Sequence, residues 1–275
     1  MRYLLLAVSF LFLAGCANES TVNTTVSNVN TNTTVTSAEP VMTTSASGNL
    51  IQTQEVTYYG NVKGYLAYNP ALSSLRPAVI VVHEWWGLND NMREIAMKLA
   101  DEGYVALAVD LYDGKLATTQ DEARTYSSAA RANPAEAMKN LDAGISYLKT
   151  LQNVNKDLIG AIGYCFGGTW SYELARQTKD LKASVMYYGQ FKPEDPFTNA
   201  DTAVLGHFGE ADTSIPLANV EKLKSTLAGV SAQDVIYTYP GAGHAFANKG
   251  SANYKEEPAQ LAWGRTLAFL RDHLK

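Results

Sequence analysis

The chain has 275 residues, of which 46% are hydrophobic and 18% charged, and its formal net charge is −5 at neutral pH. This composition is typical of a globular protein and leaves room for one large domain or two small ones. The acidic balance, without a basic block or a basic helix face, argues against nucleic acid as a partner. The two cysteines, Cys16 and Cys165, each have a local explanation, so we do not expect a disulfide between them.

The first 16 residues have the pattern of a bacterial lipoprotein signal peptide. Arg2 supplies a positive charge, and the apolar run over residues 4–14 is too short to span a bilayer comfortably. The run leads into "LAGC", which resembles a lipobox whose cysteine, Cys16, is lipidated. A buried apolar helix with an incidental cysteine is the alternative. Ala17 in place of Asp favours the outer membrane by the usual sorting rule, so we expect an exported, lipid-anchored protein that faces the periplasm.

Residues 17–50 consist mainly of Thr, Asn, Ser and Val, with almost no charge and no aromatic side chain. Such a segment cannot bury enough apolar area to offset the entropy lost on ordering. We therefore predict a flexible tether over residues 17–50 and a folded domain over residues 51–275.

Strand and helix patterns alternate along the predicted domain. A β-hairpin is expected around the turn at residues 60–61. Continuous apolar runs predict strands that are buried on both faces, at residues 77–84, 104–112, 158–165, 182–189, 203–209 and 234–240. Amphipathic patterns predict helices at residues 91–104, 133–150, 166–178 and 215–229, and a last helix carries Trp263, Leu267, Leu270 and Leu274 on one face. Together these elements predict an α/β fold, with a mostly parallel sheet covered by helices on both faces.

Residues 161–170, "AIGYCFGGTW", predict a strand that turns sharply into a helix at Cys165. Glycines stand two residues before and two after this cysteine, as a strained nucleophile position between strand and helix requires. The sulfur would then lie above the carboxyl edge of the sheet and at a helix N-terminus, which favours a thiolate. A buried structural cysteine beside turn glycines is the alternative.

Two further residues follow Cys165 in the chain order nucleophile, acid, histidine that α/β-hydrolases use. Asp212 comes just after a predicted strand, 212 − 165 = 47 residues beyond Cys165, and His244 follows the last predicted strand in a glycine-rich loop. His244 would move the thiol proton, and Asp212 would hold the ring and stabilise its cation. The alternatives are a helix cap for Asp212 and a loop histidine with a backbone hydrogen bond for His244.

A carboxylate, Glu84, stands at the end of an otherwise apolar strand and is followed by two tryptophans. We expect Glu84 to face the thiol across a pocket, with the backbone amides of Trp85 and Phe166 as the oxyanion hole. Trp86 would line the substrate pocket beside Trp85. An exposed loop glutamate and two core aromatic rings are the alternative.

The other three histidines, His83, His207 and His273, belong to no comparable arrangement. None is paired with a second cysteine or a carboxylate at a spacing typical of metal ligands. We therefore expect neither a metal nor another cofactor.

The segments "HEWWGLND", "DLYDG", "GYCFGG", "YYG", "GEADTSIP" and "GAGHAFAN" together resemble the dienelactone hydrolase (carboxymethylenebutenolidase) family over roughly residues 55–272. The resemblance implies an α/β-hydrolase fold and hydrolysis of an ester or lactone through a thioacyl-enzyme on Cys165, with Asp212 and His244 completing the triad. It also implies that Glu84 takes the thiol proton when substrate binds. Tyr187 would match a pocket tyrosine.

One departure from the family bears on the substrate. Members that hydrolyse dienelactone carry arginines that bind the substrate carboxylate, and one stands four residues after the catalytic histidine, where this chain has Asn248. Arg124 is near the position of the other, but a solvated helix residue is an equal reading. A small ester or lactone, bound by a monomer, is the expected partner. The second hypothesis is the same chemistry on a thioester, another ester or a small peptide. A hypothesis from a different functional class is a non-catalytic, lipid-anchored binding protein.

Overall fold

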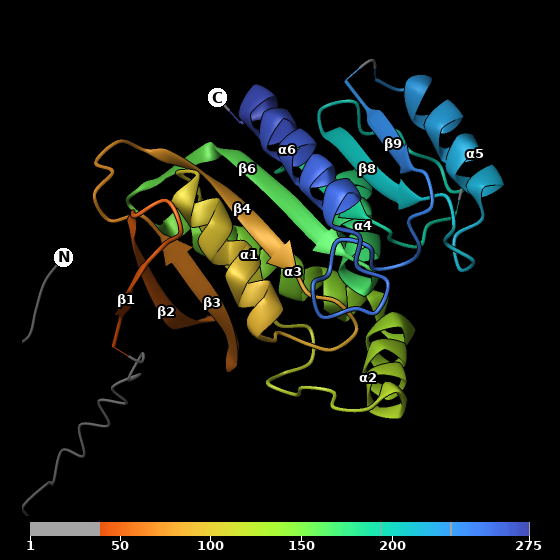
Figure 1. The fold of residues 1–275 in the computed structure, drawn as a ribbon. Coiled ribbons are helices and arrows are strands. Elements are labelled where there is room, and N and C mark those ends of the chain that lie inside the picture. Colours follow the sequence, from red (N-terminus) through yellow and green to blue (C-terminus); the bar gives the residue numbers. More distant parts are fainter. Residues whose placement is uncertain (1–38, 193, 232, 275) are drawn as a thin grey trace, which may run out of the picture. The chain divides into compact units, whose positions relative to one another are not determined.

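The computed structural model describes residues 39–192, 194–231 and 233–274 (Figure 1), so the predicted signal peptide, Cys16 and most of the predicted tether lie outside the described residues. Within this part of the chain, no helix is long and apolar enough to cross a bilayer. The described residues belong to one compact unit.

Nine strands form one sheet in the described part of the chain. They span Val41–Thr44 (β1), Leu50–Tyr59 (β2), Val62–Tyr68 (β3), Arg76–Val82 (β4), Val105–Val109 (β5), Val154–Tyr164 (β6), Ala183–Tyr187 (β7), Ala203–Gly209 (β8) and Val235–Tyr239 (β9). Their order across the sheet is β1-β2-β3-β5-β4-β6-β7-β8-β9. The strands from β5 to β9 in this order are parallel, whereas β1, β2 and β3 pair antiparallel. The parallel strands end at one edge, and this edge carries the candidate site.

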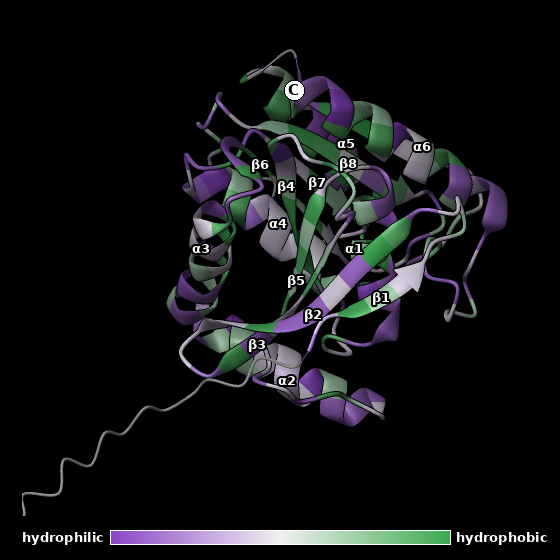
Figure 2. Cartoon of the chain, turned by 90° about the vertical axis from the view of Figure 1, so that its left-hand side faces the viewer, coloured by the Kyte–Doolittle hydropathy of each residue, from purple (hydrophilic) through white to green (hydrophobic). Residues whose placement is uncertain are grey.

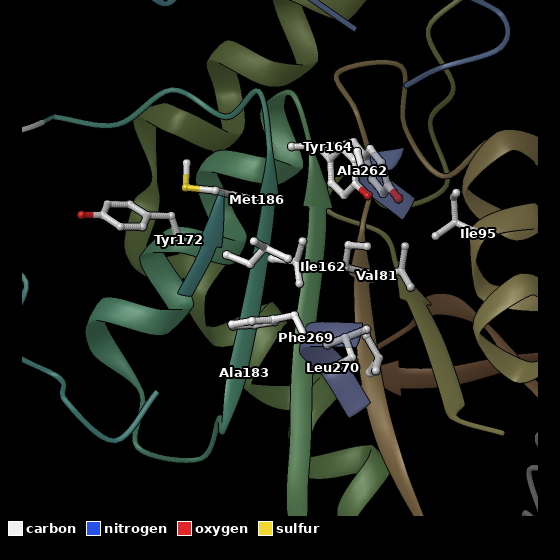
Figure 3. Close-up of a cluster of buried hydrophobic side chains, with 14 of the residues drawn as sticks. Val81, Ile95, Ile162, Tyr164, Tyr172, Ala183, Met186, Ala262, Phe269 and Leu270 are labelled. Carbon is white, nitrogen blue, oxygen red and sulfur yellow. The ribbon is translucent and has the colours of Figure 1, made fainter. Parts of the chain in front are cut away.

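Helices cover both faces of this sheet. They span Asp90–Asp101 (α1), Gln120–Ala132 (α2), Pro134–Thr150 (α3), Phe166–Gln177 (α4), Leu217–Ala228 (α5) and Glu256–His273 (α6). On one face, Ile95 of α1 and Leu270 of α6 belong to a buried cluster with Val81 and Ile162 (Figure 3). The neighbouring strand residue Ile80 points to the other face, where it belongs to a second cluster with side chains of α3 and α4.

The alternation predicted from the sequence matches this architecture, and the α/β-hydrolase fold is confirmed. The central strands carry uninterrupted apolar residues because both of their faces are covered, and β5 and β7 are coloured as hydrophobic in Figure 2. Pro134 is the first residue of α3, where its fixed backbone angle is favourable, and the side chain of the preceding Asn133 makes no capping hydrogen bond.

The predicted tether extends too far towards the C-terminus. Residues 41–44, assigned to it, form β1, which pairs antiparallel with β2. All four side chains of β1 are exposed, so backbone pairing rather than apolar burial holds the strand. The hydroxyls of Ser45 and Ser47 also donate to Asp101 on α1, at 2.7 and 2.6 Å. The composition of residues 17–50 did not predict β1, because composition indicates only how much apolar area a segment can bury. This edge strand is held by backbone pairing and does not depend on apolar burial.

Candidate active site

Cys165 occupies the sharp turn between β6 and α4 with a positive φ of 51°. Its glycine neighbours are required by close backbone contacts. A Cβ atom on Gly163 would lie 2.0 Å from the carbonyl oxygen of Gly167, and one on Gly167 would lie 2.2 Å from that of Val82. A non-glycine residue at positive φ is strained, and such strain is concentrated at functional sites. The local sequence thus holds the thiol at the start of α4, above the edge of the sheet.

His244 joins Cys165 to Asp212, although these residues come from three separate loops. Its Nε2 lies 3.1 Å from Cys165 Sγ, and its Nδ1 lies 2.7 Å from Asp212 Oδ2. Burial by itself would lower the pKa of His244, but the hydrogen bonds with Asp212 and Cys165 outweigh it and raise the pKa to about 10. The imidazole of His244 therefore retains a proton readily near neutral pH.

Asp212 is oriented by the residues that follow it in the chain. Its Oδ1 accepts hydrogen bonds from the amide and the hydroxyl of Ser214, at 2.8 and 2.6 Å, and from the amide of Ile215 at 3.3 Å. Burial opposes the charge on Asp212, but hydrogen bonds from His244 and Ser214 lower its pKa below the usual value. These contacts occupy Oδ1 and leave Oδ2 for His244. Asp212 therefore makes the cap-like contacts with Ser214 and the hydrogen bond with His244 at the same time.

Glu84 is 2% exposed and lies at the same edge of the sheet, just after β4. Its carboxylate accepts hydrogen bonds from Asn248 Nδ2 and, at 3.4 Å, from the Tyr188 hydroxyl. Burial raises the pKa of Glu84 to about 7, against the opposing effects of Asn248, His244 and Tyr188. A carboxyl group with this pKa can take up or release a proton near neutral pH.

His83 holds the backbone around Glu84. Its Nδ1 donates to the Glu84 carbonyl oxygen at 2.6 Å, and its Nε2 accepts from the Leu111 amide at 3.1 Å. Burial lowers the pKa of His83, so the ring is neutral and its tautomer is set by these two bonds. The adjacent amide of Trp85 and that of Phe166 donate to no acceptor within the described residues, which leaves both available to an oxyanion.

These groups surround a cleft of about 680 Å³. Its lining includes the side chains expected to bind substrate, Trp86, Arg124 and Asn248, together with Trp85, whose ring meets that of Trp86 edge-on at 5.1 Å. The Arg124 guanidinium is bonded to Asp121 at 2.8 Å and its side chain is 65% exposed. The structure therefore favours a solvated helix residue over a substrate-binding one, although Arg124 also lines the cleft.

The expectation for Tyr187 was wrong. Tyr187 is 1% exposed, and its hydroxyl lies 2.7 Å from Thr266 Oγ1 on α6, away from the cleft. The next residue, Tyr188, lines the cleft and contacts the His244 ring edge-on at 5.2 Å. Side chains alternate along a strand, and Tyr188 leaves β7 with a positive φ of 39° that redirects it. The doubled tyrosine of "YYG" could not show which ring faces the site.

The cleft also contains residues that the sequence did not predict, among them Ser214 and Arg131. Ser214 holds Asp212 as described above, and Arg131 places its guanidinium 5.1 Å from the Phe166 ring centre. The spacing of Gln120, Arg124, Ser127 and Arg131 puts them on one face of α2, and all four line the cleft. This helical spacing is the sequence feature that could have predicted them. The described residues contain no group of three or more His, Cys, Asp or Glu side chains suited to a metal ion.

The parallel sheet, the strained elbow and the residues gathered above it define a hydrolase of the α/β-hydrolase fold. Residues 62–274 match the model of the dienelactone hydrolase family. The chain belongs to this family, and with it to the carboxylic ester hydrolases.

Relatives and solved structures agree with this assignment. The chain is 33% identical to the "Putative carboxymethylenebutenolidase" of Synechocystis sp., over 78% of this chain and 93% of the relative. It is 29% identical to the "Probable 2-oxo-3-(5-oxofuran-2-ylidene)propanoate lactonase" of Bradyrhizobium sp., over 78% and 92% respectively. The crystal structure of a "Putative Dienelactone Hydrolase" from Klebsiella pneumoniae superposes with a TM-score of 0.73 at 28% identity, covering 81% of this chain and 99% of that one.

Proposed function

We propose that this protein hydrolyses a small ester or lactone by nucleophilic catalysis at Cys165, with His244 and Asp212 as its partners. One observation carries the proposal: the His244 ring bridges Cys165 Sγ at 3.1 Å and Asp212 Oδ2 at 2.7 Å. The relatives named as carboxymethylenebutenolidase and as a furan-ylidene lactonase support a lactone substrate.

In the first half of the reaction, the Cys165 proton passes to His244 Nε2 and the thiolate attacks the carbonyl carbon, forming a C–S bond. The amides of Trp85 and Phe166 donate to the oxygen that becomes negative. The C–O bond then breaks, and His244 gives its proton to the departing alkoxide, leaving a thioacyl-enzyme.

In the second half, water gives a proton to His244 and attacks the thioester carbonyl carbon. The C–S bond breaks, the acid leaves, and Cys165 regains its proton from His244. Asp212 stabilises the imidazolium in both halves. Glu84 lines the same cleft and, with its pKa near 7, is a second acceptor for the Cys165 proton. If Glu84 takes the thiol proton in place of His244, as the family resemblance implies, His244 enters the reaction already protonated and Cys165 later regains its proton from Glu84.

The test compares the purified full chain with its Cys165→Ala variant on p-nitrophenyl acetate, cis-dienelactone and a neutral lactone. We expect hydrolysis by the wild type and its loss in Cys165→Ala, with trapping of a thioacyl-enzyme by mass spectrometry. A Thr178→Ala variant, beyond the C-terminus of α4, is the matched control. Equal rates in wild type and Cys165→Ala would refute the mechanism.

We also propose that Cys16 is lipidated and anchors the enzyme to the outer membrane, facing the periplasm. The support is the order of charge, apolar run, small residues and cysteine in the first 16 residues. Mass spectrometry of the mature N-terminus and fractionation of a Cys16→Ala variant test this. An unmodified Cys16, or unchanged membrane association of the variant, would refute it.

A further inference from the structure

We propose that Asn253 is a positioning residue for His244, whose backbone conformation it holds so that the imidazole stays aimed at Cys165. The inference rests on the proposed function, in which His244 is the proton-transfer partner of Cys165. It gives a role in the reaction to the loop between β9 and α6, and it predicts that this loop acts on kcat rather than on substrate binding.

The backbone directly after His244 has an unfavourable conformation. Ala245 has a positive φ of 60°, which a residue with a Cβ atom adopts only at a cost in free energy. Such a conformation persists where surrounding contacts hold the chain in place. If Ala245 relaxed to a negative φ, His244 would turn relative to the rest of the loop, and its ring would leave the line between Cys165 and Asp212.

Hydrogen bonds to three consecutive carbonyl groups hold this turn. The carbonyl oxygens of Ala245 and Phe246 accept from backbone amides further along the loop, at 3.1 and 3.0 Å. The His244 carbonyl oxygen instead accepts from a side chain, the Nδ2 group of Asn253, at 3.0 Å. Among the described residues, this amide is its only donor. The catalytic side of the turn therefore depends on one side chain.

Asn253 is itself held in place for this contact. Its backbone amide donates to Ser251 Oγ at 3.1 Å. Its side chain lies beside Gly243, where an added Cβ atom would be 3.7 Å from Asn253 Cγ. Asn253 also lines the active-site cleft, so a direct contact with substrate is the competing explanation that the test must separate.

The test measures kcat and KM of the full chain on p-nitrophenyl acetate. Asn253→Asp keeps the shape of the side chain but removes both N–H donors, and Asn253→Ala removes the side chain. We expect kcat to fall about three- to tenfold in both variants, with KM changed by less than about twofold. Asn199→Ala is the matched control, because the Asn199 amide also donates to backbone carbonyls, those of Ala175 and Thr178, but lies outside the cleft.

Ala245→Gly provides a readout that a merely structural role would not move. Glycine adopts a positive φ without the cost that alanine bears, so the turn needs the Asn253 bond less. The fall in kcat caused by Asn253→Ala should therefore be smaller in the Ala245→Gly background than in the wild type. An equal fall in both backgrounds would overturn the inference. A rise in KM without a fall in kcat would also overturn it, and would make Asn253 a substrate-binding residue.

Alkylation of Cys165 separates failure of this inference from failure of the proposed catalysis, because it needs no ester. Iodoacetamide reacts with the thiolate, which an aligned imidazolium stabilises, and mass spectrometry of the peptide that contains Cys165 follows the rate. We expect slower alkylation at pH 7 in Asn253→Ala and the wild-type rate in Asn199→Ala. Slower alkylation supports the inference even if no ester is hydrolysed, and an unchanged rate in Asn253→Ala overturns it.

Discussion

Asn248 Nδ2 donates a hydrogen bond to the Glu84 carboxylate, and within the described residues no Lys or Arg nitrogen lies within 4.0 Å of that carboxylate. The two residues come from opposite ends of the folded chain and meet at the wall of the active-site cleft. An amide stabilises a buried negative charge less than a cation does, which is why burial can raise the pKa of Glu84 to about 7. Asn248 therefore contacts Glu84 directly and lowers a pKa that burial raises, apart from the substrate binding predicted for it.

Placing a cation at position 248 should make Glu84 more acidic. In an Asn248→Arg variant we expect the pKa of Glu84 to fall by about one unit or more, because a guanidinium favours the carboxylate form. If the Glu84 carboxylate must be charged to accept the thiol proton, the acidic limb of kcat/KM moves to lower pH by the same amount. Gln152→Arg, exposed and outside the cleft, is the control. An acidic limb that stays in place would show that Glu84 does not set it.

Glu84 also makes stability depend on pH. Its pKa is about 7 in the folded protein against an ordinary 4.5, so between these values only the folded state holds the proton. The contribution of this proton to the free energy of unfolding is fully present below about pH 4.5 and is lost as the pH rises through 7. The change is about 3 kcal/mol at most. Glu84→Gln should unfold like the wild type near pH 4 and be more stable at about pH 9.

Urea unfolding at the two pH values measures this difference. The exposed Glu221→Gln change on α5 serves as the matched substitution and should leave both values alike. The raised pKa would be contradicted if the difference in the free energy of unfolding between Glu84→Gln and wild type were the same at both pH values.

Ser214 should tune the His244 proton through Asp212. Loss of its hydroxyl in Ser214→Ala removes the 2.6 Å bond to Asp212 Oδ1, so the carboxylate holds the imidazolium more strongly. We expect the pKa of His244, already about 10, to rise further and the alkaline limb of kcat/KM to move upwards. The loss of kcat at neutral pH should stay below about tenfold.

Ser214→Thr keeps the hydroxyl and should restore the wild-type pH profile. Ser225→Ala, in α5, removes a hydroxyl that does not reach the cleft and provides the baseline. A uniform fall in kcat with no movement of the alkaline limb would point to a merely structural role.

His83 should be needed for both stability and activity. His83→Leu leaves the Glu84 carbonyl and the Leu111 amide without their buried partner, at a cost of about 2–4 kcal/mol in the free energy of unfolding. The Trp85 amide, which follows directly, should also shift, so kcat falls in the protein that remains folded. Urea unfolding and kcat measured on the same preparation test this, and a stable variant with wild-type kcat would refute it.

Much of the architecture could be read from local patterns. Apolar runs of strand length, separated by amphipathic helices, predict the parallel sheet because burial on both faces leaves no polar position in such strands. The glycines around Cys165 predict the elbow because backbone atoms approach within 2.2 Å of where their Cβ atoms would lie. The strand β1 escaped prediction because it rests on backbone pairing at an edge and on Ser45 and Ser47 bonding to Asp101, a residue of α1.

The chain order of Cys165, Asp212 and His244 is visible in the sequence, which also predicts that each residue follows a strand of the same sheet. Tertiary structure decided which neighbours complete the site: Tyr188 rather than Tyr187, Ser214 on Asp212, and the face of α2 that carries Arg131. The division has a physical cause. Strand and turn propensities act over a few residues, whereas the direction of a side chain that leaves a strand, and the burial that raises the pKa of Glu84, depend on helices and loops brought together only by folding.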